Sequence, residues 1–247
     1  MDESSLLEVL GDAGRAVAEA LSTVTDWGMS GQREDQYSLD LAADSAALEV
    51  LHGASLAVLS EESGLTHSGA PLLAVLDPVD GSTNASRGVP WYATSICVLD
   101  DEGPLAALVV NQANGWNYEA VRGAGATRDG RPLRPSAAAG LEHAIVGVSG
   151  LPGTVPPWWQ TRALGAAALD LCAVAEGLLD GFCSYGAEGL GPWDYLGGLL
   201  VCQEAGAVLA EAADQPLVAR DREARRHPVA AATPQLLGQL VRFRKIS

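Results

Sequence analysis

Residues 72–84 of the chain read Leu-Leu-Ala-Val-Leu-Asp-Pro-Val-Asp-Gly-Ser-Thr-Asn. The first five residues form an apolar run that predicts a buried strand, so Asp77 is expected where this strand ends and the chain bends. Gly81 lets another group approach the backbone closely. Mg²⁺ is usually held by one or two carboxylates together with substrate phosphate. An isolated Asp-Gly-Ser turn in which aspartate caps backbone amides is the competing interpretation, but the whole segment favours a site where Asp77 and Asp80 hold metal beside phosphate.

Two further acidic segments come before and after this one. Glu61 and Glu62 directly follow the apolar run at 56–59, and Asp194 lies in the sequence Pro-Trp-Asp-Tyr-Leu-Gly-Gly at 192–198. Taken singly, glutamates at a strand end can be solvated charges, and an aspartate near a helix start can stabilise the positive end of the helix dipole. Together with the central segment, they are interpreted as parts of one metal site.

These motifs resemble those of the inositol monophosphatase family, within the superfamily of magnesium-dependent, lithium-sensitive phosphomonoesterases. Residues 77–84 follow its pattern Asp-Pro-x-Asp-Gly-(Thr/Ser)-x-Asn. Residues 60–64 are similar to its acidic pair, and 192–198 to its late Trp-Asp motif. Between them, Gly-Ala-Ala-Ala at 165–168 resembles its Gly-(Ser/Thr)-Ala-Ala helix. The resemblance extends from about Asp44 to about Gly206 and depends on three acidic motifs in the family's order.

The predicted elements mix helices and strands throughout the chain, which indicates a layered α/β (α+β) protein. Helices are expected at 6–24, 42–52, 166–177 and 194–205, and strands at 56–60, 72–76, 92–99, 105–111, 116–121, 144–149 and 181–185. The resemblance implies a five-layer α-β-α-β-α sandwich of the inositol monophosphatase / fructose-1,6-bisphosphatase type. We expect one domain over 1–247, made of two closely packed halves that divide near 140–155. The resemblance also implies a homodimer.

The resemblance assigns the metal ligands. Glu61, Asp77 and the backbone carbonyl of Val79 would hold one Mg²⁺. Asp77, Asp80 and Asp194 would hold a second, so that Asp77 bridges the two ions. A weaker third ion near Glu61 is common in the family.

The phosphate and the attacking water involve the residues that follow. The backbone amides of Gly81 and Ser82 would bind the phosphate, because amides at a turn point donors at an anion. In the family, the hydroxyl at the position of Ser82 pairs with an earlier acidic residue to orient the nucleophilic water. Asp44 is the best match for that residue, and Asp40 is the alternative, since Leu41 replaces the threonine that usually stands three residues before the aspartate.

The alcohol part of the substrate is less well defined. Inositol-specific relatives carry a glutamate seven residues before the Trp-Asp aspartate, where this chain has Ala187 with Glu188 beside it. Glu188 is the candidate replacement. Ala166 removes a family hydroxyl, while the amide of Ala167 remains available to the substrate. Arg33 falls where many relatives have a lysine in a mobile loop, and surface charge is the favoured interpretation.

Composition excludes several classes of function. The net charge of -16 and the pI near 4.5 argue against a nucleic-acid-binding surface. Hydrophobic residues make up 48% and charged residues 19%, as in a folded globular protein. The acidic start does not resemble a signal peptide and no apolar run reaches membrane-spanning length, so a cytoplasmic protein without membrane contact is expected. The four cysteines are expected to be buried thiols, and no histidine is assigned a catalytic role.

The leading functional hypothesis is a Mg²⁺-dependent phosphatase acting on a small sugar or polyol phosphate, with inositol monophosphate as the default substrate. Fructose-1,6-bisphosphatase and histidinol-phosphate phosphatase activities are alternatives, and an adenosine bisphosphate substrate is disfavoured because Thr83-Asn84 replaces the expected lysine. The alternative of another class is a non-catalytic relative that binds phosphorylated metabolites or acts as a scaffold.

Overall fold

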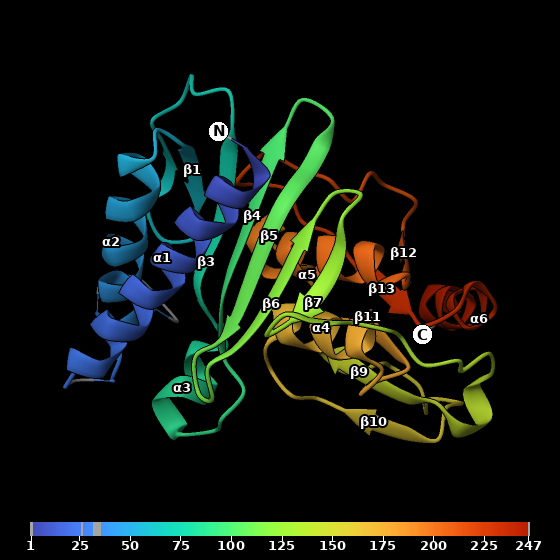
Figure 1. Cartoon of the computed structure of the whole chain (residues 1–247). Coiled ribbons are helices and arrows are strands. Elements are labelled where there is room, and N and C mark those ends of the chain that lie inside the picture. Colours follow the sequence, from blue (N-terminus) through green and yellow to red (C-terminus); the bar gives the residue numbers. More distant parts are fainter. Residues whose placement is uncertain (1, 26, 32–35, 247) are drawn as a thin grey trace.

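The chain folds into five stacked layers of helices and sheets. The computed structural model describes residues 2–25, 27–31 and 36–246. Helices α1 (Glu3–Thr23) and α2 (Ser38–Gly53) cover one face of a large sheet, and α4 (Ala167–Glu176) and α5 (Pro192–Ala205) lie between it and a smaller sheet (Figure 1). Helix α6 (Pro234–Ile246) covers the outer face of the smaller sheet. The predicted five-layer sandwich is confirmed.

The large sheet contains eight strands in the order β2-β1-β3-β4-β5-β6-β7-β8. Strands β1 and β3 are parallel, and the other pairs are antiparallel. The strands are β1 (Ala57–Ser60), β2 (Gly64–Thr66), β3 (Leu73–Asp80), β4 (Ala93–Asp100), β5 (Gly103–Asn111), β6 (Trp116–Val121), β7 (Gly125–Arg128) and β8 (Arg131–Pro132). A six-residue helix, α3 (Ser82–Arg87), follows β3.

The smaller sheet contains five strands in the order β10-β9-β11-β13-β12. Strand β9 is parallel to both of its neighbours, and the remaining pairs are antiparallel. The strands are β9 (Ile145–Ser149), β10 (Gln160–Arg162), β11 (Gly181–Ser184), β12 (Val208–Glu211) and β13 (Pro228–Ala231). A short 3₁₀ helix (Leu141–His143) precedes β9. The chain passes from the large sheet to the smaller one between β8 and β9, and the division of the domain near residues 140–155 stays a prediction.

How much of each helix is buried depends on the number of layers that the helix contacts. Helix α1 buries one stripe of residues spaced three or four apart, because only its inner side meets a sheet. Residues 167–175 of α4 are all buried, because this helix has a sheet on either side. Helix α5 is buried continuously from Tyr195 to Cys202 for the same reason. Among the helices of the described residues, none is both long enough and apolar enough to cross a bilayer.

Strand β3 differs from its prediction in a way that shapes the site. It does not end at Leu76 but continues to Asp80, and its register with β4 shifts between Asp77 and Asp80. Asp77 pairs with Ser95 and Asp80 pairs with Ala93, so two residues of β3 oppose one residue of β4. Such a β-bulge accommodates the proline at position 78, which cannot donate a ladder hydrogen bond, and it redirects the side chains beside it.

The other differences concern short or late elements. Strands β2, β7, β8, β10, β12 and β13 and helices α3 and α6 were not among the predicted elements. Helix α2 starts at Ser38, earlier than expected, because Asp40 accepts a hydrogen bond from the backbone N–H of Tyr37 (2.9 Å) and caps the helix there. The four cysteines are buried free thiols in the structure, as predicted.

Candidate metal and phosphate site

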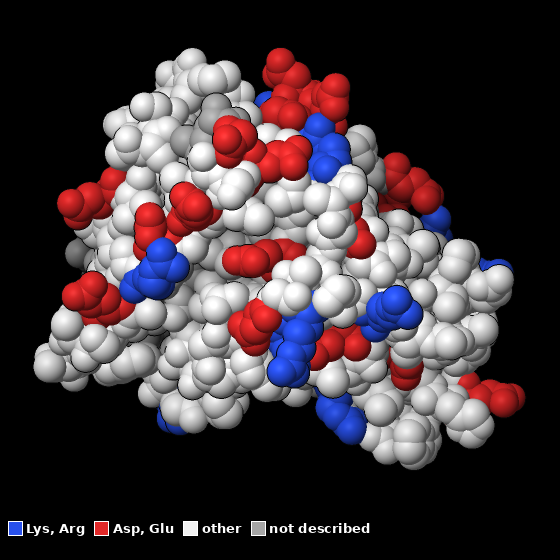
Figure 2. Space-filling model, in the orientation of Figure 1, with Lys and Arg blue, Asp and Glu red and all other residues white. Residues whose placement is uncertain are grey.

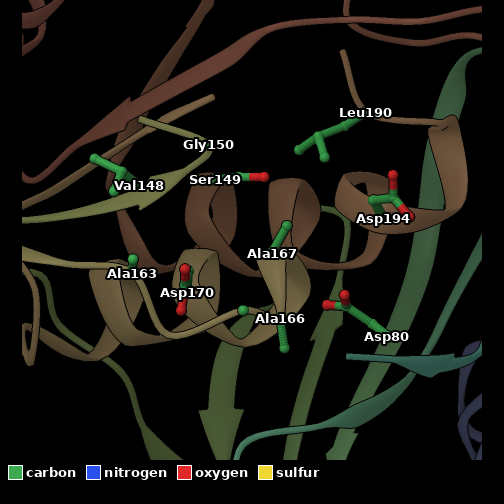
Figure 3. A pocket seen from close by; sticks show the side chains of 11 residues that line it. Asp80, Val148, Ser149, Gly150, Ala163, Ala166, Ala167, Asp170, Leu190 and Asp194 are labelled. Atoms are coloured by element: carbon green, nitrogen blue, oxygen red, sulfur yellow. The ribbon is translucent and has the colours of Figure 1, made fainter. Parts of the chain in front are cut away.

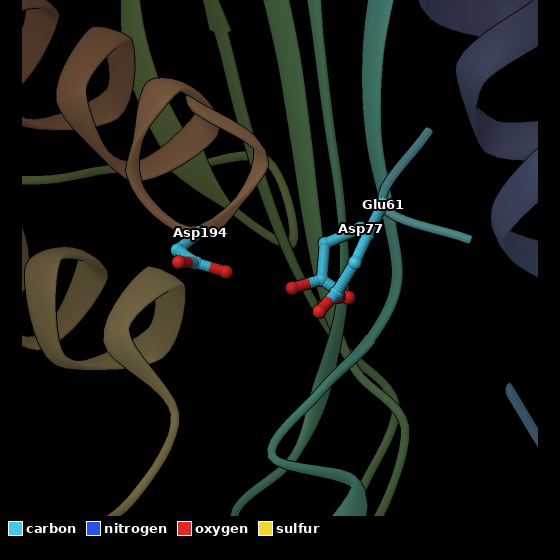
Figure 4. Close-up of side chains that lie close together, drawn as sticks. All are labelled: Glu61, Asp77 and Asp194. Atoms are coloured by element: carbon cyan, nitrogen blue, oxygen red, sulfur yellow. The ribbon is translucent and has the colours of Figure 1, made fainter. Parts of the chain in front are cut away.

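Three carboxylates from three elements converge at the edge of the large sheet. Glu61 follows β1, Asp77 lies in β3, and Asp194 lies in the first turn of α5. Each offers one oxygen, and these atoms all lie within 4.8 Å of one another (Figure 4). Glu62 points elsewhere, since its carboxylate accepts a hydrogen bond from the side-chain amide of Gln36. Of the predicted acidic pair, Glu61 is therefore the residue that joins the cluster.

Burial and mutual repulsion make this cluster unfavourable when it is fully ionised. The pKa of Asp77 is raised well above its ordinary value, first by burial and then by the charge of Glu61. Burial, followed by the charge of Asp80, raises the pKa of Asp194 to about 7. A bound cation would favour the ionised carboxylates and displace their protons. An all-oxygen donor set suits Mg²⁺, so the residues present fit the expected ion.

The turn after Asp77 is held together by short-range hydrogen bonds. The Oδ1 atom of Asp77 accepts from the backbone N–H of Val79 (3.0 Å), and the Ser82 hydroxyl donates to the Val79 carbonyl oxygen (2.8 Å). Gly81 has φ 88° and is the N-cap residue directly before α3. A Cβ atom at Gly81 would lie 3.0 Å from the carbonyl oxygen of Gly165. Glycine is thus required both by its left-handed backbone and by the close approach of the segment before α4.

Asp80 connects the large sheet to the start of α4. Its Oδ2 atom accepts a hydrogen bond from the backbone N–H of Ala168 (2.7 Å). Its pKa is raised to about 8, mainly by burial, while the bond from Ala168 opposes this shift. Asp80 is not part of the three-residue oxygen cluster formed by the described residues. In this structure it stands between that cluster and α4.

The two aspartates considered for orienting water both lie buried on α2. Asp44 accepts a hydrogen bond from the hydroxyl of Ser60, at the end of β1. Asp40 caps α2, and its charge contributes to the raised pKa of Asp77, after burial and the charges of the other carboxylates. Ser82 directs its hydroxyl to Val79. The roles of Asp44, Asp40 and Ser82 stay predictions.

A cavity of about 260 Å³ opens beside the carboxylates. It is lined by Asp80, Val148, Ser149, Gly150, Ala163, Gly165, Ala166, Ala167, Asp170, Leu190 and Asp194 (Figure 3). Ala167, whose amide was predicted to contact the substrate, is one of these lining residues, and its contact stays a prediction. Glu188 is exposed on a turn and is not among the lining residues. Arg33 lies outside the described residues.

Two arginines beside the site were missed in the sequence. Both belong to the segment between β12 and β13, whose residues 220–227 contain four arginines and a histidine, a local signal of positive charge. Arg222 donates from Nη2 to the backbone carbonyl oxygen of Glu61 (3.0 Å). Arg225 lies over the ring of Trp193, 5.4 Å from its centroid, and its charge lowers the pKa of Asp194 against the larger effect of burial.

The contact of Arg222 predicts an effect on metal affinity. Replacing Arg222 with alanine removes the donor that holds the backbone at Glu61, and loss of such supporting contacts typically weakens metal binding about 10-fold or more. We expect the Mg²⁺ concentration for half-maximal thermal stabilisation to rise by about that factor, measured by differential scanning calorimetry. Arg220→Ala is the matched control, because Arg220 donates to the backbone oxygen of Asp100 instead. Equal Mg²⁺ requirements in the two variants would contradict the prediction.

The surface carries many acidic side chains, as expected from the net charge of -16. On the face shown in Figure 2, Lys and Arg side chains stand singly or in small groups among acidic ones. The expectation that the protein binds no nucleic acid stays a prediction.

The chain is similar in sequence to known phosphatases, which agrees with a site for metal and phosphate. Residues 8–245 match the model of the Inositol monophosphatase family. The chain is 32% identical to the chloroplastic phosphatase IMPL1 of Arabidopsis thaliana, covering 83% of this chain and 62% of that protein, less than two thirds of its length. It is 33% identical to the fructose-1,6-bisphosphatase/inositol-1-monophosphatase of Archaeoglobus fulgidus, covering 85% of this chain and 86% of the relative.

The chain is also similar to a further relative in sequence and to a solved structure in fold. The Nus factor SuhB of Pseudomonas aeruginosa is 34% identical, with 70% of each protein covered. The structure of an extragenic suppressor from Pyrococcus furiosus superposes with a TM-score of 0.85 at 23% identity, covering 97% of this chain and 100% of the other. At that identity the superposition shows the shared fold.

Proposed function

Because the chain belongs to the inositol monophosphatase family, a family of phosphatases that act on small phosphate esters, we propose that it is a Mg²⁺-dependent phosphomonoesterase. Its substrate would be a small sugar or polyol phosphate, with inositol monophosphate as the default. The observation that carries this proposal is the convergence of oxygens from Glu61, Asp77 and Asp194 within 4.8 Å. The single domain, the homodimer and the cytoplasmic location remain predictions.

One group of residues would hold the metal ions. Glu61, Asp77, Asp194 and the Val79 carbonyl, with Asp80, would hold two or three Mg²⁺ ions. When bound, these ions supply charge neutralisation at the phosphoryl oxygens and make a bound water more acidic.

The remaining groups position the ester and the water. The amides of Gly81 and Ser82 would orient the phosphate for in-line attack. The Ser82 hydroxyl, paired with Asp44 or Asp40, would accept a hydrogen bond from the attacking water and orient it. In this structure the hydroxyl donates to the Val79 carbonyl oxygen, which leaves its oxygen lone pairs to accept from water.

Metal removal tests the proposal directly. Phosphate release is measured on inositol 1-phosphate, fructose 1,6-bisphosphate, histidinol phosphate and adenosine 3′,5′-bisphosphate, with Mg²⁺ and after treatment with EDTA. We expect EDTA to lower turnover of the best substrate at least about 100-fold, since the ions are worth several kcal/mol in the transition state. Added Mg²⁺ should restore it. Equal low rates on all four esters would contradict any narrow substrate assignment.

The name Nus factor, carried by relatives of this chain, supports a second candidate in which the protein acts by binding and not by hydrolysis. The same assay separates the two. A folded protein that releases no phosphate from any of the four esters with Mg²⁺ would favour the binding role.

A further inference from the structure

The cavity beside the carboxylate cluster contains an acidic side chain that the proposed mechanism does not use. Asp170 lies in the first turn of α4, is only 1% exposed, and lines the cavity together with Asp80 and Asp194 (Figure 3). The other described residues around the cavity are small or apolar, and none of them is Lys, Arg or His. This carboxylate therefore has no cationic side chain facing it across the cavity.

One side-chain oxygen of Asp170 already accepts a hydrogen bond. Its Oδ1 atom accepts a hydrogen bond from the indole Nε1–H of Trp91 (2.9 Å). In the part of the chain that the structure describes, this is the only hydrogen bond formed by the Asp170 side chain. The second oxygen, Oδ2, is therefore left available to a group inside the cavity.

Such an oxygen is costly unless a donor reaches it. A buried carboxylate loses its hydration, and the loss is compensated when hydrogen-bond donors or a positive charge take the place of water. Burial indeed raises the pKa of Asp170 to about 7, while the bond from Trp91 opposes this shift. A ligand that brings a hydroxyl or an ammonium group into the cavity would supply the missing partner.

The cavity is placed to receive the alcohol part of a phosphate ester. Asp80 and Asp194 line the cavity on the side of the carboxylate cluster. Asp170 is close to Asp80, since its charge is the largest cause after burial that raises the pKa of Asp80. An ester whose phosphate lies at the turn of Gly81 would extend its alcohol past Ala167 toward Asp170.

We propose that Asp170 determines substrate specificity by accepting a hydrogen bond from a hydroxyl or a protonated amine on the alcohol part of the ester. This inference rests on the proposed phosphatase function and defines its substrate class as esters that carry a donor away from the phosphate. A purely structural alternative exists, in which Asp170 only holds the indole of Trp91. The asparagine variant separates the two, because its amide oxygen can still accept from Trp91.

The experiment compares the wild type, Asp170→Asn and Trp91→Phe on three esters. Inositol 1-phosphate carries hydroxyls, histidinol phosphate carries a protonated amine, and 4-nitrophenyl phosphate carries no donor on its alcohol part. For Asp170→Asn we expect kcat/KM on 4-nitrophenyl phosphate to stay within about threefold of wild type, while it falls at least about 10-fold on the ester that Asp170 recognises.

The size of the loss identifies the donor. A hydroxyl can still bond to the amide oxygen of asparagine, so a loss of about 10-fold on inositol 1-phosphate indicates a polyol. An ammonium loses its counter-charge, so a loss of about 100-fold on histidinol phosphate indicates an amino alcohol. Trp91→Phe keeps the Asp170 charge and should preserve the preference for the recognised ester over 4-nitrophenyl phosphate.

Two results would overturn the inference. One is an equal loss on all three esters in Asp170→Asn, matched by Trp91→Phe, which would leave Asp170 a structural role only. The other is no loss on either donor-bearing ester. If the wild type with Mg²⁺ releases phosphate neither from these three esters nor from fructose 1,6-bisphosphate and adenosine 3′,5′-bisphosphate, the proposed function fails, and Kd values from calorimetry with Ca²⁺ then decide on Asp170. Weakening of at least about 10-fold for one donor-bearing ester supports its role, and unchanged Kd values reject it.

Discussion

Replacing Asp77 with asparagine will abolish Mg²⁺-dependent phosphate release and will also stabilise the metal-free protein. Asparagine keeps the oxygen that accepts from the Val79 N–H at 3.0 Å, so the turn at the bulge of β3 is preserved. The variant loses the charge at the centre of the cluster formed with Glu61 and Asp194. Since that charge would bridge the bound ions, we expect turnover to fall at least about 1,000-fold.

The gain in stability follows from the raised pKa of Asp77. Burial, followed by the charge of Glu61, raises this pKa well above its ordinary value, so the folded protein binds a proton that the unfolded chain has released. Stability of the metal-free wild type is therefore reduced increasingly as pH rises above the ordinary aspartate value. Asparagine carries no such charge. The melting temperature in EDTA should exceed that of wild type by a margin that is larger at pH 8 than at pH 5.

Calorimetry in EDTA at the two pH values, beside the phosphate release assay, checks both parts. Asp101→Asn is the matched control, because Asp101 is exposed in the turn between β4 and β5 and the substitution changes the net charge equally. The control should leave turnover and melting temperature near their wild-type values. Retention of Mg²⁺-dependent turnover within tenfold of wild type in Asp77→Asn would remove Asp77 from the centre of the site.

The largest effect on stability is expected from Gly198→Ala. Gly198 lies in α5 where this helix crosses α4, and an added Cβ atom would lie 2.6 Å from the Cβ of Leu171 and 2.9 Å from the carbonyl oxygen of Ala168. Alanine is normally favoured over glycine in a helix by about 1 kcal/mol. Overpacking typically costs 1–3 kcal/mol and occasionally more. Because the obstructing atoms include backbone, we expect an overpacking cost above this range, about 3–4 kcal/mol, and hence a net loss of about 2–3 kcal/mol, which corresponds to a melting temperature lower by about 4–12 °C.

Activity should fall together with stability in Gly198→Ala, because the first turns of α4 and α5 carry Ala168, which binds Asp80, and Asp194. Gly238→Ala is the control. It lies within α6, and an added Cβ atom there meets nothing within 4 Å, so it should stabilise the protein slightly through helix propensity. Equal melting temperatures for the two variants would show that the α4–α5 contact relaxes without cost.

The parts of the fold and site that could be predicted are those with a local signal. The carboxylates brought together at Glu61, Asp77 and Asp194 each follow a recognisable motif, and long apolar strands such as β4 and β5 stand out from their neighbours. Strands β12 and β13 have only four residues each, and no predicted element covered the last forty residues. Short strands are held by their partners in the sheet, and the sequence of one strand does not reveal its partner.

Contacts between distant segments could not be predicted from the sequence either. The bond from Arg222 to the backbone of Glu61 and the capping of α4 by Asp80 both depend on how the layers stack. Asp170 did offer a signal, since it is the only charged residue in the apolar run 163–175. A charge in a helix that is otherwise suited to burial on all sides indicates a specific partner, and the partner proved to be Trp91.

The convergence of Glu61, Asp77 and Asp194 also has a topological consequence. The first two residues come from neighbouring strands, but Asp194 arrives after the chain has completed β4 to β11 and entered the second sheet. A cation held by all three would therefore act as a reversible cross-link that closes a very long loop of chain. Like any ligand that binds only the native state, it would stabilise the assembled layers by mass action. The concentration of the cation would then influence the stability of the fold as well as its chemistry.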